Sequence, residues 1–194
     1  MSPTELVDLT RSLLQSLDSR LVDGFVALWP EGTVSRTAES TQLPVLRWLE
    51  PVGRQAPAFS ASLIEALRRA APALHWAQTY RASEAEAHFL RNYGWTELFG
   101  KIGPGVSRRL ACGFLLLGPA VLYPRHVHEA EELYIPLSGV ADWEQGDEVW
   151  REQIPGAVIH HEPREPHAIR TRAQPLLALY LWRGTDLGQK AKLC

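Results

Sequence analysis

Histidines are concentrated in one part of the sequence. Five of the seven lie between His126 and His167. Within the run HVHEAEELY, His126, His128, Glu132 and Tyr134 share one parity, so a continuous strand would point all four side chains to the same face. Two imidazoles and a carboxylate that converge suit Zn, Fe, Mn, Co or Ni, whereas Ca²⁺ prefers more oxygen ligands. The spacing therefore predicts a site for one divalent transition-metal ion.

The remaining histidines offer weaker signals. His75 and His88 stand alone in the first half of the chain, and we expect them to be hydrogen-bonded residues of the core or surface. His160 and His161 are neighbours, so in a strand they face opposite sides and at most one can enter the interior. We assign neither of these two to the site.

The elements that must position the site change in character along the chain. Aliphatic residues at helical spacing predict helices over residues 3–18, 60–71 and 83–93, and a stretch rich in Pro, Gly and aromatic residues predicts packed loops over 29–57. From Gly100 onward, short apolar runs alternate with turn residues at intervals of about ten. This half predicts antiparallel strands in a sandwich or small barrel, with alternate residues lining its interior.

Composition restricts the kind of partner. The 194 residues carry a net charge of -2, so no basic field attracts nucleic acid or an anionic membrane, and a small-molecule partner is expected. No apolar stretch reaches the roughly 20 residues of a membrane-spanning helix, and the amphipathic start lacks the features of a secretory signal. The two cysteines form no disulfide framework, which favours a reducing, cytoplasmic location.

Two motifs resemble those of the cupin superfamily. HVHEAEELYIPLSG has the form H-x-H-x3-E-x6-G of the first cupin motif, and PGAVIHHEPREPHAIRT is similar to the second, whose single histidine here is His167. Glu165 stands where the family often has glycine. The resemblance implies a mainly β fold, a double-stranded β-helix (cupin) barrel. We expect it over residues 100–194, with an α-helical N-terminal extension over residues 1–99.

Finer features resemble the cupin-type dimethylsulfoniopropionate lyases. They are the helical first half and the segments YPRHVH, EELYIPLSG, HHEPREPHAIRT and PLLALYLWRG. The resemblance implies a carbon–sulfur lyase that releases dimethyl sulfide and acrylate by β-elimination, with Tyr134 near the metal as the base. The implied metal ligands come from the two motifs, with Tyr134 as an additional one, and they are His126, His128, Glu132 and His167.

The substrate of such a lyase is a sulfonium carboxylate. A metal would bind its carboxylate, and a cation beside the Tyr134 phenol favours phenolate. Aromatic faces suit the sulfonium charge, so Tyr123 and Trp182, which flank the motif strands, are expected to bind substrate, while His126 is either a ligand or a substrate contact. The tryptophans of the first half are expected to pack in the core, namely Trp29, Trp48, Trp76 and Trp95.

Two alternatives share the same ligands. One is another metal-dependent cupin enzyme, an isomerase or oxygenase that acts on a small carboxylate, and the other is a non-catalytic, ligand-sensing cupin. The sequence leaves open the native metal and assembly into a homodimer.

Overall fold

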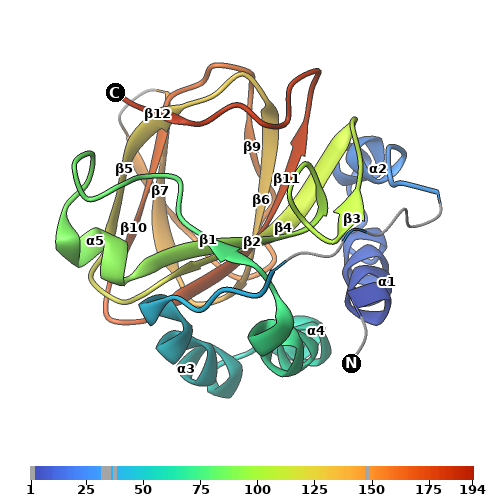
Figure 1. The fold of residues 1–194 in the computed structure, drawn as a ribbon, viewed down its shortest axis with the longest axis horizontal. Coiled ribbons are helices and arrows are strands. Elements are labelled where there is room, and N and C mark those ends of the chain that lie inside the picture. Colours follow the sequence, from blue (N-terminus) through green and yellow to red (C-terminus); the bar gives the residue numbers. More distant parts are fainter. Residues whose placement is uncertain (1–2, 32–35, 37–38, 147–148) are drawn as a thin grey trace.

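The computed structural model describes residues 3–31, 36, 39–146 and 149–194. Its helices, including two short 3-10 turns, precede most of the strands and are α1 (Pro3–Gln15), α2 (Arg20–Val26), η1 (Pro44–Trp48), α3 (Leu49–Arg54), α4 (Ala58–Ala70), η2 (Ala71–Ala73) and α5 (Ala87–Arg91). Among the described residues, no helix combines the length and apolar character that crossing a bilayer requires. Figure 1 shows α1, α2, α3 and α4 around the bottom and right of the barrel of strands, with α5 apart from them at the left.

The strands form two sheets. The first has the order β1-β2-β4-β11-β6-β9, with β3 beside β2, and the second has the order β12-β5-β10-β7-β8. Their bounds are β1 (Trp76–Ala77), β2 (Tyr93–Gly100), β3 (Gly105–Val106), β4 (Leu110–Leu117), β5 (Leu122–Val127), β6 (Glu131–Ser138), β7 (Ala141–Gln145), β8 (Trp150–Gln153), β9 (Ile159–His161), β10 (His167–Thr171), β11 (Leu176–Arg183) and β12 (Lys192–Leu193). This is the expected cupin barrel.

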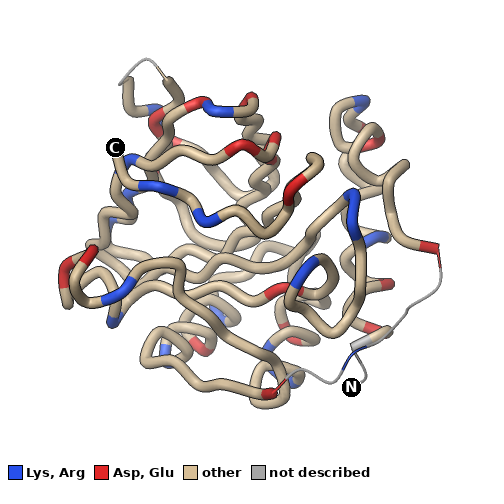
Figure 2. The backbone as a smooth tube through the Cα atoms, turned by 45° about the horizontal axis from the view of Figure 1, so that its top comes forward, with Lys and Arg blue, Asp and Glu red and all other residues tan. Residues whose placement is uncertain are grey.

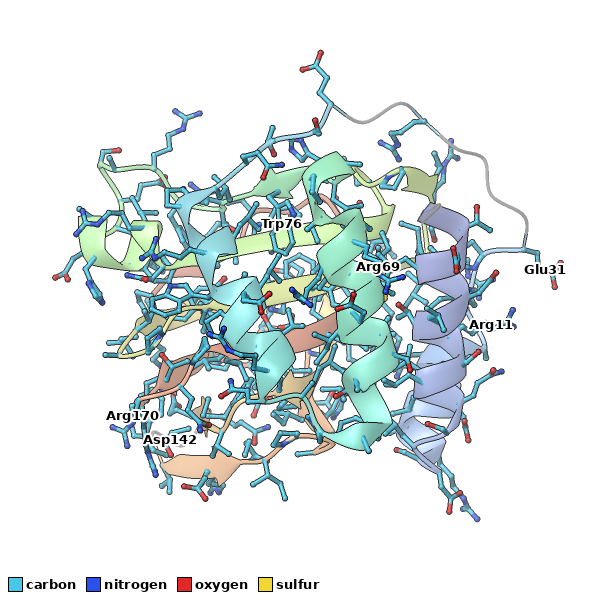
Figure 3. All side chains as sticks on the ribbon, turned by 90° about the horizontal axis from the view of Figure 1, so that it is seen from below. Arg11, Glu31, Arg69, Trp76, Asp142 and Arg170 are labelled. Carbon is cyan, nitrogen blue, oxygen red and sulfur yellow. The ribbon has the colours of Figure 1, made fainter. Side chains whose placement is uncertain are left out.

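The first sheet separates two apolar cores. On its outer face, leucines of the strands pack against α1, α2 and α4, and on its inner face aromatic and aliphatic residues fill the barrel. β11 shows the division, because Leu177, Leu179 and Leu181 join the outer core while Ala178 and Tyr180 join the inner one. Figure 3 shows α1 and α4 lying across these strands, and Figure 2 shows charges of both signs interspersed along the chain.

The helices agree only partly with the sequence-based expectation. The first ends at Gln15 rather than near Asp18, which has a positive φ of 43°. The third, expected over 83–93, is confined to Ala87–Arg91 because Glu84 closes a turn by accepting a hydrogen bond from the Arg81 N–H. The packed stretch over 29–57 contains η1 and α3 as well as loops.

The strand boundaries also differ from the expectation. β2 begins at Tyr93, so a long strand of the first sheet lies before the expected boundary at residue 100, and the division into two units stays a prediction. Gly139, the last residue of the first motif, has a φ of 86°, and a Cβ there would lie 2.1 Å from the Pro175 carbonyl oxygen. The glycine therefore allows the tight connection between β6 and β7.

Candidate functional site

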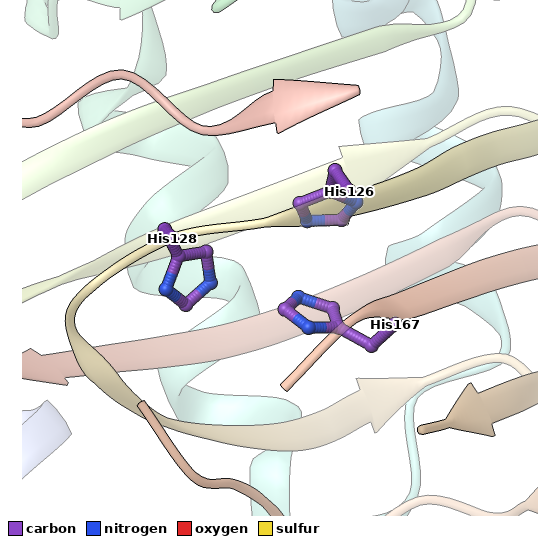
Figure 4. Close-up of side chains that lie close together, drawn as sticks. All are labelled: His126, His128 and His167. Carbon is purple, nitrogen blue, oxygen red and sulfur yellow. The ribbon is translucent and has the colours of Figure 1, made fainter. Parts of the chain in front are cut away.

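Three buried histidines meet inside the barrel. His126 lies on β5, His128 follows that strand and His167 opens β10. One ligand nitrogen from each lies within 4.8 Å of the others, as Figure 4 shows for the three rings. His126 and His167 are directly opposite each other in the pairing of β5 with β10, which explains how residues far apart in sequence converge.

Backbone carbonyls fix the orientation of all three rings. Nδ1 of His126 donates to the Pro124 oxygen, Nδ1 of His128 to that of Ala130, and Nδ1 of His167 to that of Glu165, each at 2.9 Å. A carbonyl only accepts, so Nδ1 of each ring carries a proton and Nε2 is the atom left to bind a metal. Nε2 of His128 is also hydrogen-bonded to Glu132, and although burial lowers the pKa of this ring, Glu132 raises it above the ordinary value, so this nitrogen donates to the carboxylate when it is protonated. Among the described residues, Nε2 of His167 is buried without a hydrogen bond. This donor set fits a divalent transition metal.

Glu132 on β6 adds a carboxylate to the histidines. Its Oε2 lies 2.9 Å from Nε2 of His128 and 3.3 Å from Nε2 of His167, and its Oε1 accepts a hydrogen bond from the Trp182 indole. Burial raises the pKa of Glu132, but His128 and His167 outweigh this effect and hold it well below the ordinary value. Burial and the neighbouring His167 lower the pKa of His126, so its ring is neutral and able to bind a metal.

The expected continuous strand over 126–134 is wrong. β5 ends at Val127 and β6 begins at Glu131, and the two strands belong to different sheets. His126 and Glu132 nevertheless both point inward, because the connection between β5 and β6 carries the chain across the barrel with the inward face preserved. The alternation of side chains along the sequence therefore predicted that these residues face one another, but it assumed a single strand that the chain does not form.

A cavity of about 410 Å³ opens beside the histidines, and two of the predicted substrate residues, Tyr123 and Trp182, line it, whereas the third, His126, does not. Tyr123 stacks on His126, with ring centroids 4.2 Å apart and planes within 8°, and Trp182 packs on His128 at 4.3 Å. Tyr134 lines the same cavity and is 4% exposed. The roles of Tyr123, Trp182 and Tyr134 stay predictions, but all three side chains face the space next to the histidines.

Tyr134 is a neutral phenol in the absence of a cation. Burial raises its pKa well above the ordinary value, and the charge of Glu132 raises it further. A positive charge beside its oxygen would act in the opposite direction. Any use of Tyr134 as a base therefore depends on a cation at the adjacent donor set.

A row of residues across the first sheet forms the floor of the cavity. Glu97, Gly113, Tyr180 and Tyr134 lie directly opposite one another on β2, β4, β11 and β6. Sequence reasoning missed Glu97 and Tyr180, although Tyr180 has the same parity as Trp182 and could have been found from it. Trp95 was expected in the core, but it is partly exposed and lines the cavity from β2.

The other histidines behave as expected. Of the adjacent pair, His161 is fully buried and stacks on His167 with centroids 3.9 Å apart, whereas His160 is partly exposed and lies 2.9 Å from Glu131. His75 and His88 are hydrogen-bonded to backbone carbonyls away from the cavity.

The family follows from comparison with known proteins. A sequence model described as dimethylsulfoniopropionate lyase matches residues 20–178. The chain belongs to the dimethylsulfoniopropionate lyase family. This membership confirms the resemblance seen in the sequence and the expectation of a carbon–sulfur lyase, and it favours that activity over the isomerase, oxygenase and sensor alternatives.

Individual lyases are similar over most of the chain. The dimethylsulfoniopropionate lyase DddQ of Ruegeria pomeroyi is 32% identical over 161 residues, which cover 83% of this chain and 80% of that protein. The crystal structure of DddQ from the same species superposes with a TM-score of 0.89 at 29% identity and covers 98% of this chain and 95% of that one. A crystal structure reported for the lyases RdDddP and RnDddQII superposes with a TM-score of 0.90 at 31% sequence identity. The match covers 99% of this chain and 97% of that one.

More distant structures share only the fold. A cupin-2 domain from Rhodospirillum rubrum has a TM-score of 0.51 at 18% identity and covers 63% of this chain and 76% of its own. This chain therefore has a cupin fold with added helices. The N-terminal helices are matched in the lyase structures, which cover nearly the whole chain.

Proposed function

We propose that this chain cleaves dimethylsulfoniopropionate to dimethyl sulfide and acrylate in the cavity beside His126, His128 and His167. The proposal is carried by the placement of a buried phenol, Tyr134, in an aromatic-walled cavity next to three histidines whose Nε2 atoms converge. The cavity admits a small carboxylate, and the family membership supplies the substrate class.

Four residues would hold the metal, namely His126, His128, Glu132 and His167, with Tyr134 as an additional ligand. Of Zn, Fe, Mn, Co and Ni, each accepts nitrogen and oxygen donors of this kind. When bound, such an ion would supply Lewis-acid stabilisation of the substrate carboxylate and would lower the pKa of the neighbouring phenol.

Tyr134 is proposed to move the proton. Its oxygen removes a proton from the carbon next to the substrate carboxylate, and the electrons of that C–H bond form the double bond of acrylate as the C–S bond breaks. Dimethyl sulfide leaves as a neutral molecule with the electron pair of that bond. The surrounding aromatic side chains exclude water and so keep the base from exchanging its proton during the step.

Tyr123 and Trp182 are proposed to hold the substrate. Both rings present faces to the cavity, and their stacking on His126 and His128 fixes them close to the donor set. Aromatic faces attract a sulfonium cation. His126, which has Tyr123 on one face, would in this arrangement contact the substrate as well as the metal.

The test is a phenol-to-phenyl substitution. Tyr134→Phe should retain bound metal by elemental analysis and lose at least about 100-fold in the rate of dimethyl sulfide and acrylate release, the range expected for removal of a general base. Tyr80→Phe is the matched control, because it removes a buried hydroxyl that forms no hydrogen bond within the described part of the chain, and Tyr80 lies outside the cavity lining. A Tyr134→Phe variant with wild-type turnover would eliminate the proposed base.

A further inference from the structure

The cavity has a second charged region away from the histidines. Glu97 lies at the opposite end of the floor row from Tyr134, is 6% exposed and lines the cavity. Since neighbouring strands are about 4.8 Å apart, three strand spacings separate the two backbones. A ligand anchored at the histidines would therefore extend toward Glu97.

Backbone hydrogen bonds, rather than an ion pair, hold the Glu97 carboxylate. Its Oε1 accepts hydrogen bonds from the backbone N–H groups of Ile102 and Gly103, both at 2.7 Å, and among the described residues it forms no ion pair. Lys101 and Lys190 also line the cavity, but they pair with Asp186 and Glu84. Burial raises the pKa of Glu97, although the backbone hydrogen bonds and the charge of Arg36 oppose this. A cation in the cavity would therefore favour the ionised carboxylate.

Aromatic rings fill the space between Glu97 and Tyr134. A Cβ at Gly113 would lie 2.8 Å from the hydroxyl of Tyr180, so the Tyr180 ring lies over this glycine and extends from β11 toward β2. Trp95 and Trp182 each stand edge-on to Tyr180 with centroids 6.4 Å away. Ring faces beside a carboxylate attract weakly hydrated cations.

We propose that Glu97, with Trp95, Tyr180 and Trp182, forms a cation-binding end of the cavity that selects onium substrates over neutral carboxylates of the same shape. The inference rests on the proposed function, because it takes the substrate carboxylate to be held at the histidines. The onium group then lies over the Tyr180 and Trp182 rings. Glu97 is a specificity-determining residue. It lies on β2, one strand beyond β4 as seen from Tyr180 on β11, and its charge attracts the onium group.

Three non-reacting ligands separate charge from shape. Isocaproate replaces the sulfonium sulfur of dimethylsulfoniopropionate with a carbon and is neutral at that position. β-Alanine betaine carries a permanent trimethylammonium cation whose amine is a poor leaving group. 4,4-Dimethylpentanoate is the neutral carbon analogue of the betaine and accounts for the third methyl group that isocaproate lacks. The dissociation constant of each is measured by calorimetry with the metal-loaded protein at pH 8. We expect the wild-type protein to bind the betaine at least about tenfold more tightly than either neutral ligand, which corresponds to about 1.4 kcal/mol.

Glu97→Gln removes the charge and keeps the oxygen that accepts the two backbone hydrogen bonds. This variant should lose about tenfold in affinity for the betaine while its affinity for isocaproate is unchanged. Glu152→Gln is the control for net charge, because Glu152 lies outside the cavity lining, is exposed and pairs with Arg172, which also lies outside the lining. Its preference for the betaine should equal that of the wild-type protein.

The outcomes distinguish this inference from the proposed function. Equal affinity of the wild-type protein for the betaine and 4,4-dimethylpentanoate overturns the cation-binding end, and this result does not require a folded variant. An unchanged preference in Glu97→Gln overturns the role of Glu97. Absence of dimethyl sulfide release by the wild-type protein, with selective binding of the betaine retained, would overturn only the lyase activity and leave the cation-binding end in place.

Discussion

Gly113 lies in the cavity floor, at a position where an added methyl group should strongly destabilise the folded protein. A Cβ there would lie 2.0 Å from the Thr96 carbonyl oxygen and 2.7 Å from Cε1 of Tyr180. The backbone oxygen belongs to the paired strand β2, so relief requires the strands to separate as well as the ring to move. We expect Gly113→Ala to lower the free energy of unfolding by about 3 kcal/mol, the upper part of the range for overpacking.

Urea unfolding followed by tryptophan fluorescence measures this loss. With a slope of about 2 kcal/mol per molar urea, the midpoint should fall by about 1.5 M. Gly24→Ala is the matched control, because Gly24 is exposed within α2 and an added Cβ would meet only the end of the Arg183 side chain at 3.4 Å. That variant should gain about 0.5–1 kcal/mol, since alanine is favoured over glycine inside a helix.

A second variant separates the two contacts at Gly113. Tyr180→Leu removes the ring atoms but leaves the Thr96 oxygen in place, so Gly113→Ala should still destabilise a Tyr180→Leu background. If Gly113→Ala and Gly24→Ala shift the midpoint in the same direction, or if Gly113→Ala leaves it unchanged, then the close packing of β2 on β4 is not as described.

Three other results are expected. Treatment with a strong chelator should abolish turnover and lower the melting temperature, and adding a divalent metal back at about 100 times its dissociation constant should restore about 2.7 kcal/mol of stability, as differential scanning calorimetry would measure. Asp142, which pairs with Arg170 and Arg172, is buried, and although burial raises its pKa the two arginines lower it below the ordinary 3.8. Its contribution to the free energy of unfolding is therefore complete above about pH 4 and is lost as the pH falls through the folded-state pKa. In the Asp142→Asn variant, the free energy of unfolding should depend less strongly on pH in the acid range, as circular dichroism would measure. Ser60 donates a buried hydrogen bond from α4 to the Leu137 oxygen at 2.7 Å, and Ser60→Ala should cost about 1 kcal/mol in urea unfolding.

The histidine group was predictable from the sequence because its donors lie close together in two short motifs. His126 and His128 are separated by one residue, and Glu132 follows after three more. The convergence of His126 and His128 with His167 was anticipated even though the assumed single strand was wrong, because all three side chains, like that of Glu132 on β6, are buried in the barrel. The short-range alternation of side chains was sufficient to predict this group, without knowledge of the path of the backbone.

The far end of the cavity was not predictable in the same way. Glu97 and Trp95 belong to a strand whose sequence was assigned to the helical half, and their position depends on pairing with β4. The turn at Arg81 shortened the expected helix and left Tyr93 free to begin that strand. Such long-range pairing is decided by tertiary packing, which local propensity does not encode.

The alternation along β11 separates two kinds of change that evolution or an engineer could make. Residues 177, 179 and 181 face the helices, whereas residues 178, 180 and 182 face the barrel interior, where the last two line the cavity. Substitutions at the first set can therefore change the stability of the protein with little effect on catalysis. Substitutions at the second set can change which substrates the cavity accepts. A one-residue insertion in this strand would exchange the two sets and disrupt both properties at once.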